Sequence, residues 1–409
     1  MIRSALFSDS GLSLLLHSLK SALALLVNWL VLAQFPSTDY VTWTVTSSVL
    51  VVATASDLGI GQYTTTRLLH TSRDYWSIVL WESNIALLPL SLLGAFFVFF
   101  ALGAQPAIYK VVMAIGIGLR ILTIPSGALL NSINQFKLRK AIEAAMYLFA
   151  ATVIAVMAVT QVPILWALLT LNIAFLAGGC VTVVMGRRYI TVAKNIHTTA
   201  YHQKALGTLY RASVPYMINN LTGLLTYGGL IWFCSFFLDT EALARLSVLH
   251  TFILINSYQI YDVLLKSRQA DLVDARHLAR TGRLNSMLML LTPVLVLLFG
   301  PTVLGGVAPR LIFSNIELVL FAAFLSLEFG FLYLQSVIQV DPTRAVILGR
   351  CSWVKFTSQS LAIGAYGFAQ HAHEGLIGLL SNLIVATAIG YAICLKLTGH
   401  LTSNSSVKN

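Results

Sequence analysis

Charged residues are scarce in this 409-residue chain: only 10% are Asp, Glu, Lys or Arg, whereas 57% are hydrophobic. The mean hydropathy is +0.81. A water-soluble globule needs more polar residues than this to cover its surface. The composition therefore excludes a soluble protein and predicts a polytopic membrane protein. The net charge of +11, which would indicate nucleic-acid binding in a soluble protein, is explained here by membrane topology.

Cysteine is also scarce, and all four cysteines lie in apolar stretches. We expect buried thiols there rather than disulfides or metal ligands. His371, His373 and Glu374 are residue types that bind metals, but they lie together in a short predicted outer loop, which favours a simple loop over a metal site. The sequence therefore predicts no metal ion and no cofactor.

Twelve apolar stretches are long enough to cross a bilayer as helices, which takes about 20 residues each. They are residues 12–34, 40–60, 76–103, 109–131, 142–161, 163–185, 212–237, 243–265, 284–308, 311–340, 345–370 and 375–397. The sequence thus predicts an all-α membrane protein of about 12 transmembrane helices.

Two residue patterns recur at nearly equal distances along the chain and divide it into similar halves. The turn at residues 35–39 recurs at residues 237–241, which is 202 positions later, again between apolar spans. A second set recurs 205 positions later, with Leu129, Ile133, Arg139 and Ile142 matched by Leu334, Ile338, Arg344 and Ile347. Two nearly equal offsets indicate two homologous halves, as in many secondary transporters. We predict an N-terminal unit at 1–190, a cytoplasmic linker at 191–211 and a C-terminal unit at 212–409.

The positive charges are distributed unevenly among the loops. Of 26 Lys and Arg residues, 20 lie in the N-terminus, the even-numbered loops and the tail, and only Lys110, Arg245 and Arg310 lie in the odd-numbered loops. The positive-inside rule then places both termini in the cytoplasm. The outer loops are short, which leaves no outer domain for a catalytic site.

Ionisable residues inside the predicted spans are functional candidates, because each costs several kcal/mol unless it faces a cavity or a partner. The cations are Lys20, Arg120 and Lys355, and the carboxylates are Glu82 and Glu328. Polar faces surround some of them: Asn28 shares a helix face with Lys20, and Asn219 and Asn220 lie on the seventh span. Asp57 and Asp262 lie at predicted inner ends of helices. We predict a substrate-binding role for Lys20, Asn28, Arg120, Asn219, Asn220 and Lys355, and a coupling or gating role for Asp57, Glu82, Asp262 and Glu328.

Structural roles are the alternative for each group. Lys20 and Glu82 lie near enough to the inner face for their charges to reach the headgroups. Arg120 or Lys355 could form an ion pair with Glu82 or Glu328, and Asp57 could bind backbone N–H groups at a helix end. The three buried cations outnumber the two buried carboxylates, and this balance suits a cavity for an anionic group such as phosphate together with sugar hydroxyls.

The chain resembles the Wzx-type polysaccharide flippases of the multidrug/oligosaccharidyl-lipid/polysaccharide exporter superfamily. The resemblance rests on Asp39-Tyr40 in the first turn, on residues 57–61 followed by Arg67, and on the runs 131–140 and 237–283. It covers nearly the whole chain as twelve spans in two halves. Val41 departs from the family, which often has glycine after the tyrosine.

This resemblance implies two six-helix bundles around a central cavity, with alternating access. It also implies a flippase, not an enzyme, that moves an undecaprenyl-pyrophosphate-linked oligosaccharide across the bacterial inner membrane for O-antigen, capsule or exopolysaccharide synthesis. Its partners would be that lipid-linked oligosaccharide, membrane lipid and a polysaccharide polymerase, with no nucleic acid. The alternatives are a multidrug cation exporter of the same superfamily, which would be expected to have a carboxylate where this chain has Lys20, and an integral-membrane polymerase, which would need a larger outer loop.

Overall fold

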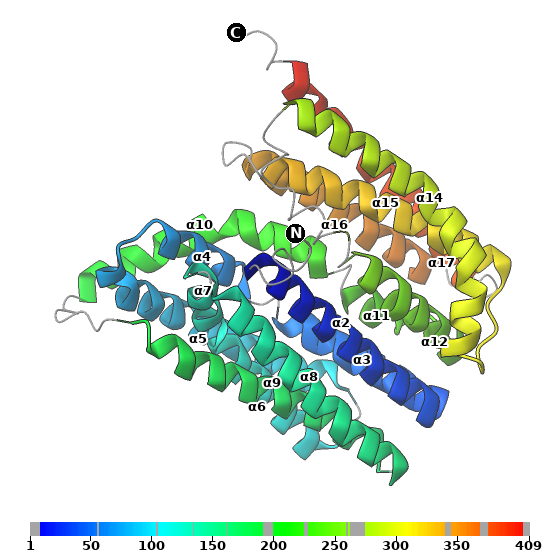
Figure 1. Cartoon of the computed structure of the whole chain (residues 1–409), viewed down its shortest axis with the longest axis horizontal. Helices are drawn as coiled ribbons and strands as arrows, with labels where there is room; N and C mark the ends of the chain where they lie inside the picture. Colours follow the sequence, from blue (N-terminus) through cyan, green and yellow to red (C-terminus); the bar gives the residue numbers. More distant parts are fainter. Residues whose placement is uncertain are drawn as a thin grey trace. The chain divides into compact units, whose positions relative to one another are not determined.

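The computed structural model describes residues 9–54, 57–103, 105–133, 135–160, 162–190, 199–224, 228–258, 261, 275–339, 345–368 and 375–403. Every regular element in these ranges is a helix (Figure 1). The predicted fold class, an all-helical polytopic membrane protein, is confirmed. The chain divides into two compact units, Met1–Asn220 and Leu221–Asn409.

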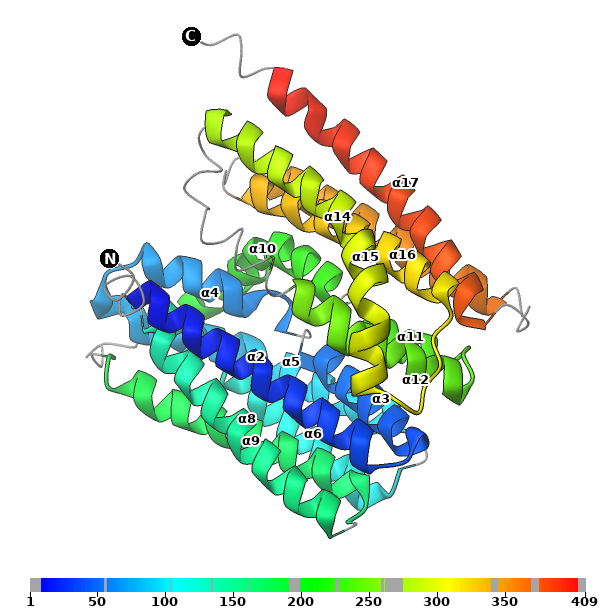
Figure 2. The same cartoon turned by 45° about the vertical axis from the view of Figure 1, so that its right-hand side comes forward.

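Unit 1 contains α2 (Asp9–Gln34), α3 (Ser37–Thr54), α4 (Ile60–Leu69) and α5 (Trp76–Ala101), followed by α6 (Ala107–Leu122), α7 (Ile124–Ser132), α8 (Phe136–Val159) and α9 (Ile164–Arg187). A short 3₁₀ turn, η2 (Arg73–Tyr75), precedes α5. Helix α2 packs along α8, α5 packs on α6, and α8 packs on α9. Figures 1 and 2 both show α2, α8 and α9 running side by side.

Two helical segments of unit 1 are interrupted, one between α3 and α4 and the other between α6 and α7. Between α3 and α4, Leu58 and Gly59 have φ values of 49° and 74°, in the left-handed region. A Cβ atom at Gly59 would lie 2.5 Å from the backbone nitrogen of Met217, so both the backbone angle and the close approach of α10 (Thr199–Leu224) require glycine. Between α6 and α7, Pro125 lacks the N–H that would continue the helical hydrogen bonds, and the helix breaks at Thr123.

Helix α10 includes residues 199–211, which the sequence analysis placed in the linker, and the division of the chain into units, after Asn220, falls within this helix. Its N-terminal half is tied to unit 1 by the Tyr210 hydroxyl, which donates to the Ala86 carbonyl at 2.7 Å.

Unit 2 contains α11 (Leu230–Cys234), α12 (Thr240–Val248), the π-helical segment η4 (Leu249–Ile255), α14 (Ala275–Val307), α15 (Asn315–Gln339), α16 (Ala345–Phe368) and α17 (Gly375–Ser403). Helix α15 packs against α14, α16 and α17. Asp239 in the second copy of the repeated turn caps α12 by accepting a hydrogen bond from the Ala242 N–H at 2.7 Å. This side chain satisfies one of the free N–H groups at the start of α12, as N-cap residues commonly do.

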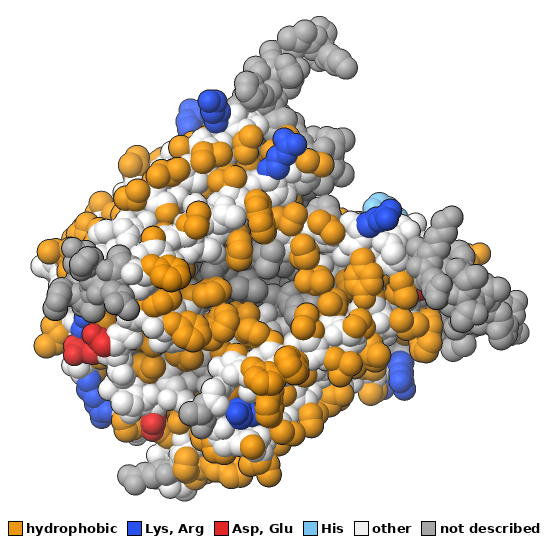
Figure 3. Space-filling model, turned by 180° about the vertical axis from the view of Figure 1, so that it is seen from behind, with side chains coloured by type: hydrophobic (Ala, Val, Ile, Leu, Met, Phe, Trp, Pro, Cys, Tyr) orange, Lys and Arg blue, Asp and Glu red, His pale blue; other side chains and the backbone are white. Residues whose placement is uncertain are grey.

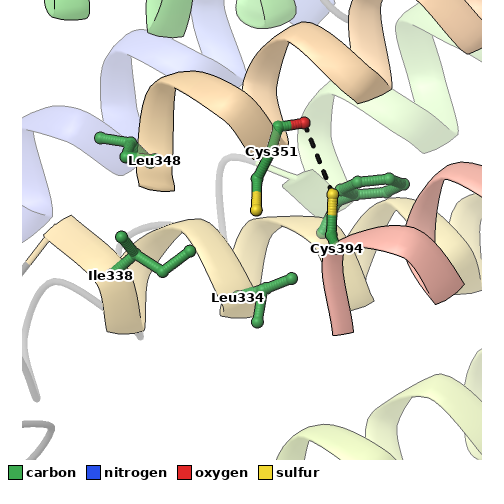
Figure 4. Packing of buried hydrophobic residues seen from close by; sticks show 6 residues of the cluster. Leu334, Ile338, Leu348, Cys351 and Cys394 are labelled. Carbon is green, nitrogen blue, oxygen red and sulfur yellow. Dashed lines mark hydrogen bonds between the residues drawn. The ribbon is translucent and has the colours of Figure 1, made fainter. Parts of the chain in front are cut away.

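The hydrophobic core of each unit includes residues of the pattern that recurs 205 positions along the sequence. In unit 1, Leu129 packs with Leu68, Trp76, Val79 and Leu80. In unit 2, its counterpart Leu334 packs with Phe331, Ile338, Leu348, Cys351 and Cys394 (Figure 4). The two cysteines are free thiols, and the Cys394 thiol donates to the Cys351 carbonyl at 3.6 Å.

Seven helices in the described residues are long and apolar enough to cross a membrane: Arg73–Ala101, Ala107–Ser132, Leu138–Val159, Ile164–Arg187, Gly282–Val307, Asn315–Ile338 and Gly375–Thr398. The other predicted spans coincide with helices that are shorter, interrupted or more polar, such as α2 with Lys20 and α16 with Lys355. Hydrophobic side chains cover much of the face in Figure 3, as expected of a surface in contact with lipid.

Candidate functional site

A cavity of about 740 Å³ lies within unit 1. Its walls come from α2, the α3–α4 break, the α6–α7 break, α8 and α9. The charged and aromatic residues among those lining it are Lys20, Asp57, Arg120, Arg139, Lys140, Glu143, Tyr147 and Phe175. The cavity therefore forms where two helices are interrupted, so the breaks in α3–α4 and α6–α7 create space as well as turning the chain.

Small residues leave this space open. Gly127, Gly178, Gly179 and Thr182 all line the cavity. A Cβ atom at Gly179 would lie 2.8 Å from the Thr123 hydroxyl, so α9 passes close to the α6–α7 break only because it has glycine there.

Glu143 is the centre of the charged wall. Its carboxylate lies 3.1 Å from the Lys20 ammonium and 2.9 Å from the Lys140 ammonium, both measured to Oε2. The Nε of Arg139 donates to Oε1 at 3.2 Å. One carboxylate thus holds three cations from two helices, α2 and α8. Such charge-assisted contacts fix the geometry of the cluster but leave it with a net charge of about +2.

Arg120 occupies another wall, in the last turn of α6. Its guanidinium carbon lies 4.5 Å from the centre of the Phe175 ring, a cation–π contact. Tyr147 packs edge-on against the same ring, with centroids 5.1 Å apart. Among the described residues, no ion pair or side-chain hydrogen bond engages the guanidinium of Arg120. The aromatic pair therefore positions a cation that still has its N–H donors available for a ligand.

Asp57 contributes the second carboxylate of the lining. It accepts hydrogen bonds from the backbone N–H groups of Gly59 at 3.0 Å and Gly61 at 3.3 Å. These contacts hold the left-handed turn that starts α4. Asp57 therefore binds backbone N–H groups at a helix end, which is the structural role given above as the alternative. Its coupling role stays a prediction.

The lining carries four cations against two carboxylates. Neither carboxylate faces the cavity as an unbound anion, because Asp57 binds backbone N–H groups and Glu143 binds three cations. A ligand would therefore meet a positive field, which attracts phosphate and repels organic cations.

The structure brings together three residues that the sequence selected, Lys20, Arg120 and Asp57. Asn28 lies outside the cavity lining. Its side-chain amide donates to the Ala24 carbonyl at 2.8 Å and accepts from the Trp43 indole at 2.9 Å, which joins α2 to α3. Glu82 is buried and lies 2.5 Å from the Arg67 guanidinium. The predicted functional roles of Asn28 and Glu82 stay predictions.

Lys355, which the sequence predicts to bind substrate, lies in a buried ion pair inside unit 2, and its predicted role stays a prediction. Its ammonium lies 2.6 Å from Glu328 Oε2, and the two side chains are 1% and 0% exposed. Gln359 donates to the other oxygen of Glu328 at 2.6 Å and to the Thr387 hydroxyl at 3.3 Å. Packing of α15 against α16 and α17 encloses this group inside unit 2. The lysine can be buried there because the Glu328 carboxylate on the neighbouring helix neutralises its charge.

Three further candidates have side chains outside the described residues. The side chains of Asn219 and Asn220 lie outside the described residues, although their backbone belongs to α10. Asp262 and the run from His371 to Glu374 also lie outside them. Their predicted roles stay predictions.

Sequence reasoning missed Arg139 and Lys140, because they look like inner-loop charges before a span that starts at residue 142. It also missed Glu143, although this residue lies inside that span. The signal was their spacing of three and four residues, which puts all three on one face once the helix starts at Phe136.

No protein-family model and no curated protein sequence matches the chain. Solved structures do match it over most of its length. An inward-facing multidrug resistance MATE family transporter of the MOP superfamily is 14% identical with a TM-score of 0.65, and the match covers 98% of this chain and 100% of the other. The lipid II flippase MurJ, in an inward closed conformation, is 14% identical with a TM-score of 0.68, covering 94% and 86% of the two chains. The chain has the fold of these MOP transporters.

A third structure with this fold is a MOP superfamily transporter from Pyrococcus furiosus, whose binding pocket is described as reversed in polarity. It is 14% identical with a TM-score of 0.62, and the match covers 98% of this chain and 95% of the other. The MOP fold thus holds proteins that differ in what their pockets bind, so function has to be argued from the residues of the cavity.

Proposed function

We propose that this protein is a flippase that moves an undecaprenyl-pyrophosphate-linked oligosaccharide across the bacterial inner membrane for surface polysaccharide synthesis. Both termini would lie in the cytoplasm. The observation that carries the proposal is the cavity of unit 1, where four cations and two engaged carboxylates surround a space within membrane-spanning helices.

A diphosphate group needs such a site. An unpaired anion in hydrocarbon costs many kcal/mol, and the hydrocarbon core is about 30 Å thick. Lys20, Lys140 and Arg139 can bind phosphate oxygens on one wall, and Arg120 can bind from another. The ammonium and guanidinium groups supply the charge compensation that lipid cannot.

The positions of the cations along their helices suggest an order of contact. Arg139 and Lys140 lie in the first turns of α8, at its predicted cytoplasmic end, whereas Arg120 lies deep within the span 107–132. A headgroup that enters from the cytoplasm would first meet the cluster at Glu143 and then Arg120. Transport would follow by alternating access, as expected for folds built from two repeats.

The cation-exporter alternative has less support. An organic cation needs an accessible carboxylate, but Glu143 is held by Lys20, Lys140 and Arg139, and Asp57 by backbone N–H groups. The same field that attracts a diphosphate opposes a cation at this position.

Purified protein in liposomes would test the proposal. The liposomes would contain an undecaprenyl-diphosphate oligosaccharide in both leaflets, and a membrane-impermeant glycosidase would be added outside. We expect cleavage of about half of the oligosaccharide in empty liposomes and of nearly all of it in liposomes with the protein. Ethidium efflux in the same liposomes is the control for the exporter alternative. Cleavage that stays at the level of empty liposomes would refute the flippase.

A further inference from the structure

We propose that Glu143 is a built-in counter-anion, which occupies the phosphate site of the empty cavity and releases its cations to the diphosphate of the substrate. This inference rests on the proposed function in taking a diphosphate as the anion. It gives the Glu143 carboxylate a role that goes beyond its contribution to the net charge of the cavity.

The first observation is the number of cations around Glu143. Both of its oxygens are engaged, Oε2 by Lys20 and Lys140 and Oε1 by Arg139. A structural ion pair needs one cation for each carboxylate, whereas this cluster has two positive charges in excess. Lysine and arginine side chains that converge in this way form a site for an anion with more charge and more oxygens than a carboxylate has.

The second observation is access. The exposed fractions of the side chains are 21% for Lys20, 36% for Arg139, 10% for Lys140 and 17% for Glu143. All four line the cavity. The Lys355–Glu328 pair, by contrast, is 1% and 0% exposed. An anion that enters the cavity can therefore reach the cations of the Glu143 cluster without disrupting a packed core.

The third observation is Arg120, which is held against Phe175 and makes no ion pair among the described residues. Arg120, Glu143 and Arg139 line the same cavity. A diphosphate has two phosphate groups, so one can take the place of the Glu143 carboxylate while the other binds Arg120. The single carboxylate of Glu143 cannot pair with the cations on its own wall and with Arg120 at the same time.

The exchange also explains how a strongly positive site could release its cargo. While the diphosphate is bound, Glu143 has lost its cations and repels the phosphate next to it. Return of the carboxylate to Lys20, Lys140 and Arg139 offsets the loss of the substrate's contacts. Glu143 thus weakens binding and speeds release, and without it the cavity would retain the anion.

Binding of inorganic pyrophosphate to the purified full-length protein tests this role without transport. We expect Glu143→Gln to bind pyrophosphate about tenfold or more tightly than the wild type, since one competing charge-assisted contact of typical strength is removed. Lys140→Gln should bind about tenfold more weakly. Glu241→Gln is the matched control, because this glutamate is 73% exposed and pairs with Arg245 in unit 2. Its pyrophosphate affinity should equal that of the wild type.

Glu143→Asp keeps the test decisive if the glutamine variant does not fold. The shorter carboxylate cannot reach all three cations, so pyrophosphate should bind a few-fold more tightly than to the wild type. Unchanged or weaker binding by the folded Glu143 variants would overturn the proposal, because a merely structural carboxylate would position the cations for the ligand.

Two further arms separate the sources of the diphosphate. Undecaprenyl diphosphate in nanodiscs should compete with pyrophosphate, and phosphatidylglycerol in matched nanodiscs should not. Lack of competition by undecaprenyl diphosphate would overturn the assignment to a lipid headgroup. Tighter binding by Glu143→Gln in a protein that fails the liposome assay would leave the counter-anion in place and refute the flippase. Lipid movement in the liposome assay without tighter pyrophosphate binding by Glu143→Gln would support the flippase and refute the counter-anion.

Discussion

Glu143 in unit 1 and Glu328 in unit 2 are both carboxylates within helical bundles, but they have opposite surroundings. Glu143 is shared by three cations at the wall of a cavity, whereas Glu328 is held by Lys355 and Gln359 and is 0% exposed. At Glu328 one positive charge matches one negative charge, and Lys355 and Gln359 donate to the carboxylate. At Glu143 the cations are in excess, and the space beside them is open.

This difference separates two reasons for placing charge in a membrane protein. A matched pair in a closed core contributes to the specificity of packing and costs little as long as both partners remain. An unmatched set beside a cavity gains its full stabilisation only when an anion arrives. From this comparison we expect the cations around Glu143 to bind a ligand and the Lys355–Glu328 pair to stabilise packing.

Access of water should show the sharpest contrast between the two units. In a background with the exposed Cys180 changed to alanine, Thr65→Cys on the cavity wall and Thr387→Cys beside Gln359 are a matched pair. We expect an anionic methanethiosulfonate reagent to modify Thr65→Cys fully and Thr387→Cys only after unfolding, as measured by intact mass. A cationic reagent should react more slowly with Thr65→Cys. Equal modification of the two cysteines would end the distinction between open and closed sites.

Loss of a carboxylate should cost more stability in unit 2 than in unit 1. Glu328→Ala leaves the Lys355 charge buried without its partner, and we expect a loss of about 3–5 kcal/mol. Thermal unfolding in detergent would show this as a large decrease in melting temperature. Replacing both members, with Glu328→Leu and Lys355→Met, should recover much of the loss. Glu143→Ala should cost less because water in the cavity can solvate its cations, and an equal cost would contradict the comparison.

Arg120 should affect transport more than stability. We expect Arg120→Ala to reduce lipid movement in liposomes by about 10- to 100-fold, the effect of losing a charged hydrogen-bond donor to phosphate. Arg120→Lys should retain part of the activity, because lysine keeps the charge without the bidentate geometry. Arg188→Ala, an exposed arginine outside the cavity, is the control. Normal transport by well-folded Arg120→Ala would assign Arg120 a structural role like that of Lys355.

Phe175 should have the smallest effect of these residues. Phe175→Leu removes the ring beneath the Arg120 guanidinium, a contact worth about 0.5–1 kcal/mol at a partly exposed site. We expect a two- to fivefold decrease in pyrophosphate affinity with little change in melting temperature. Phe331→Leu removes a ring 5.2 Å from the Lys355 ammonium, and it should change stability but not affinity. A loss of affinity with Phe331→Leu would show that the closed site also reaches the ligand.

The residues of the candidate site were predictable to different degrees. Lys20 and Arg120 could be selected from the sequence, because a cation within an apolar span is costly without a function. The cluster at Glu143 could not be recognised without the start of α8, since Arg139 and Lys140 at a span boundary are also what the positive-inside rule predicts. Helix boundaries are the least certain part of a sequence-based prediction, and here a shift of six residues left Arg139 and Lys140 outside the predicted span.

The same limit applies to Lys355. Its sequence neighbours, Ser352 and Gln359, are polar and suit a cavity as well as a buried hydrogen-bond network. Glu328 lies 27 residues earlier on another helix, and only the packing of α15 against α16 brings it to 2.6 Å from the lysine.

Composition and local pattern by themselves determined that this is a helical membrane protein, where several of its turns fall, and that Lys20, Arg120 and Lys355 lie within apolar stretches. These are properties of the residues and their immediate neighbours. The tertiary structure alone decided which cations share the cavity of unit 1 and which are neutralised in unit 2. Charge is carried by each residue, but the energy of a charge depends on its distance to partners and water, and helix packing sets those distances.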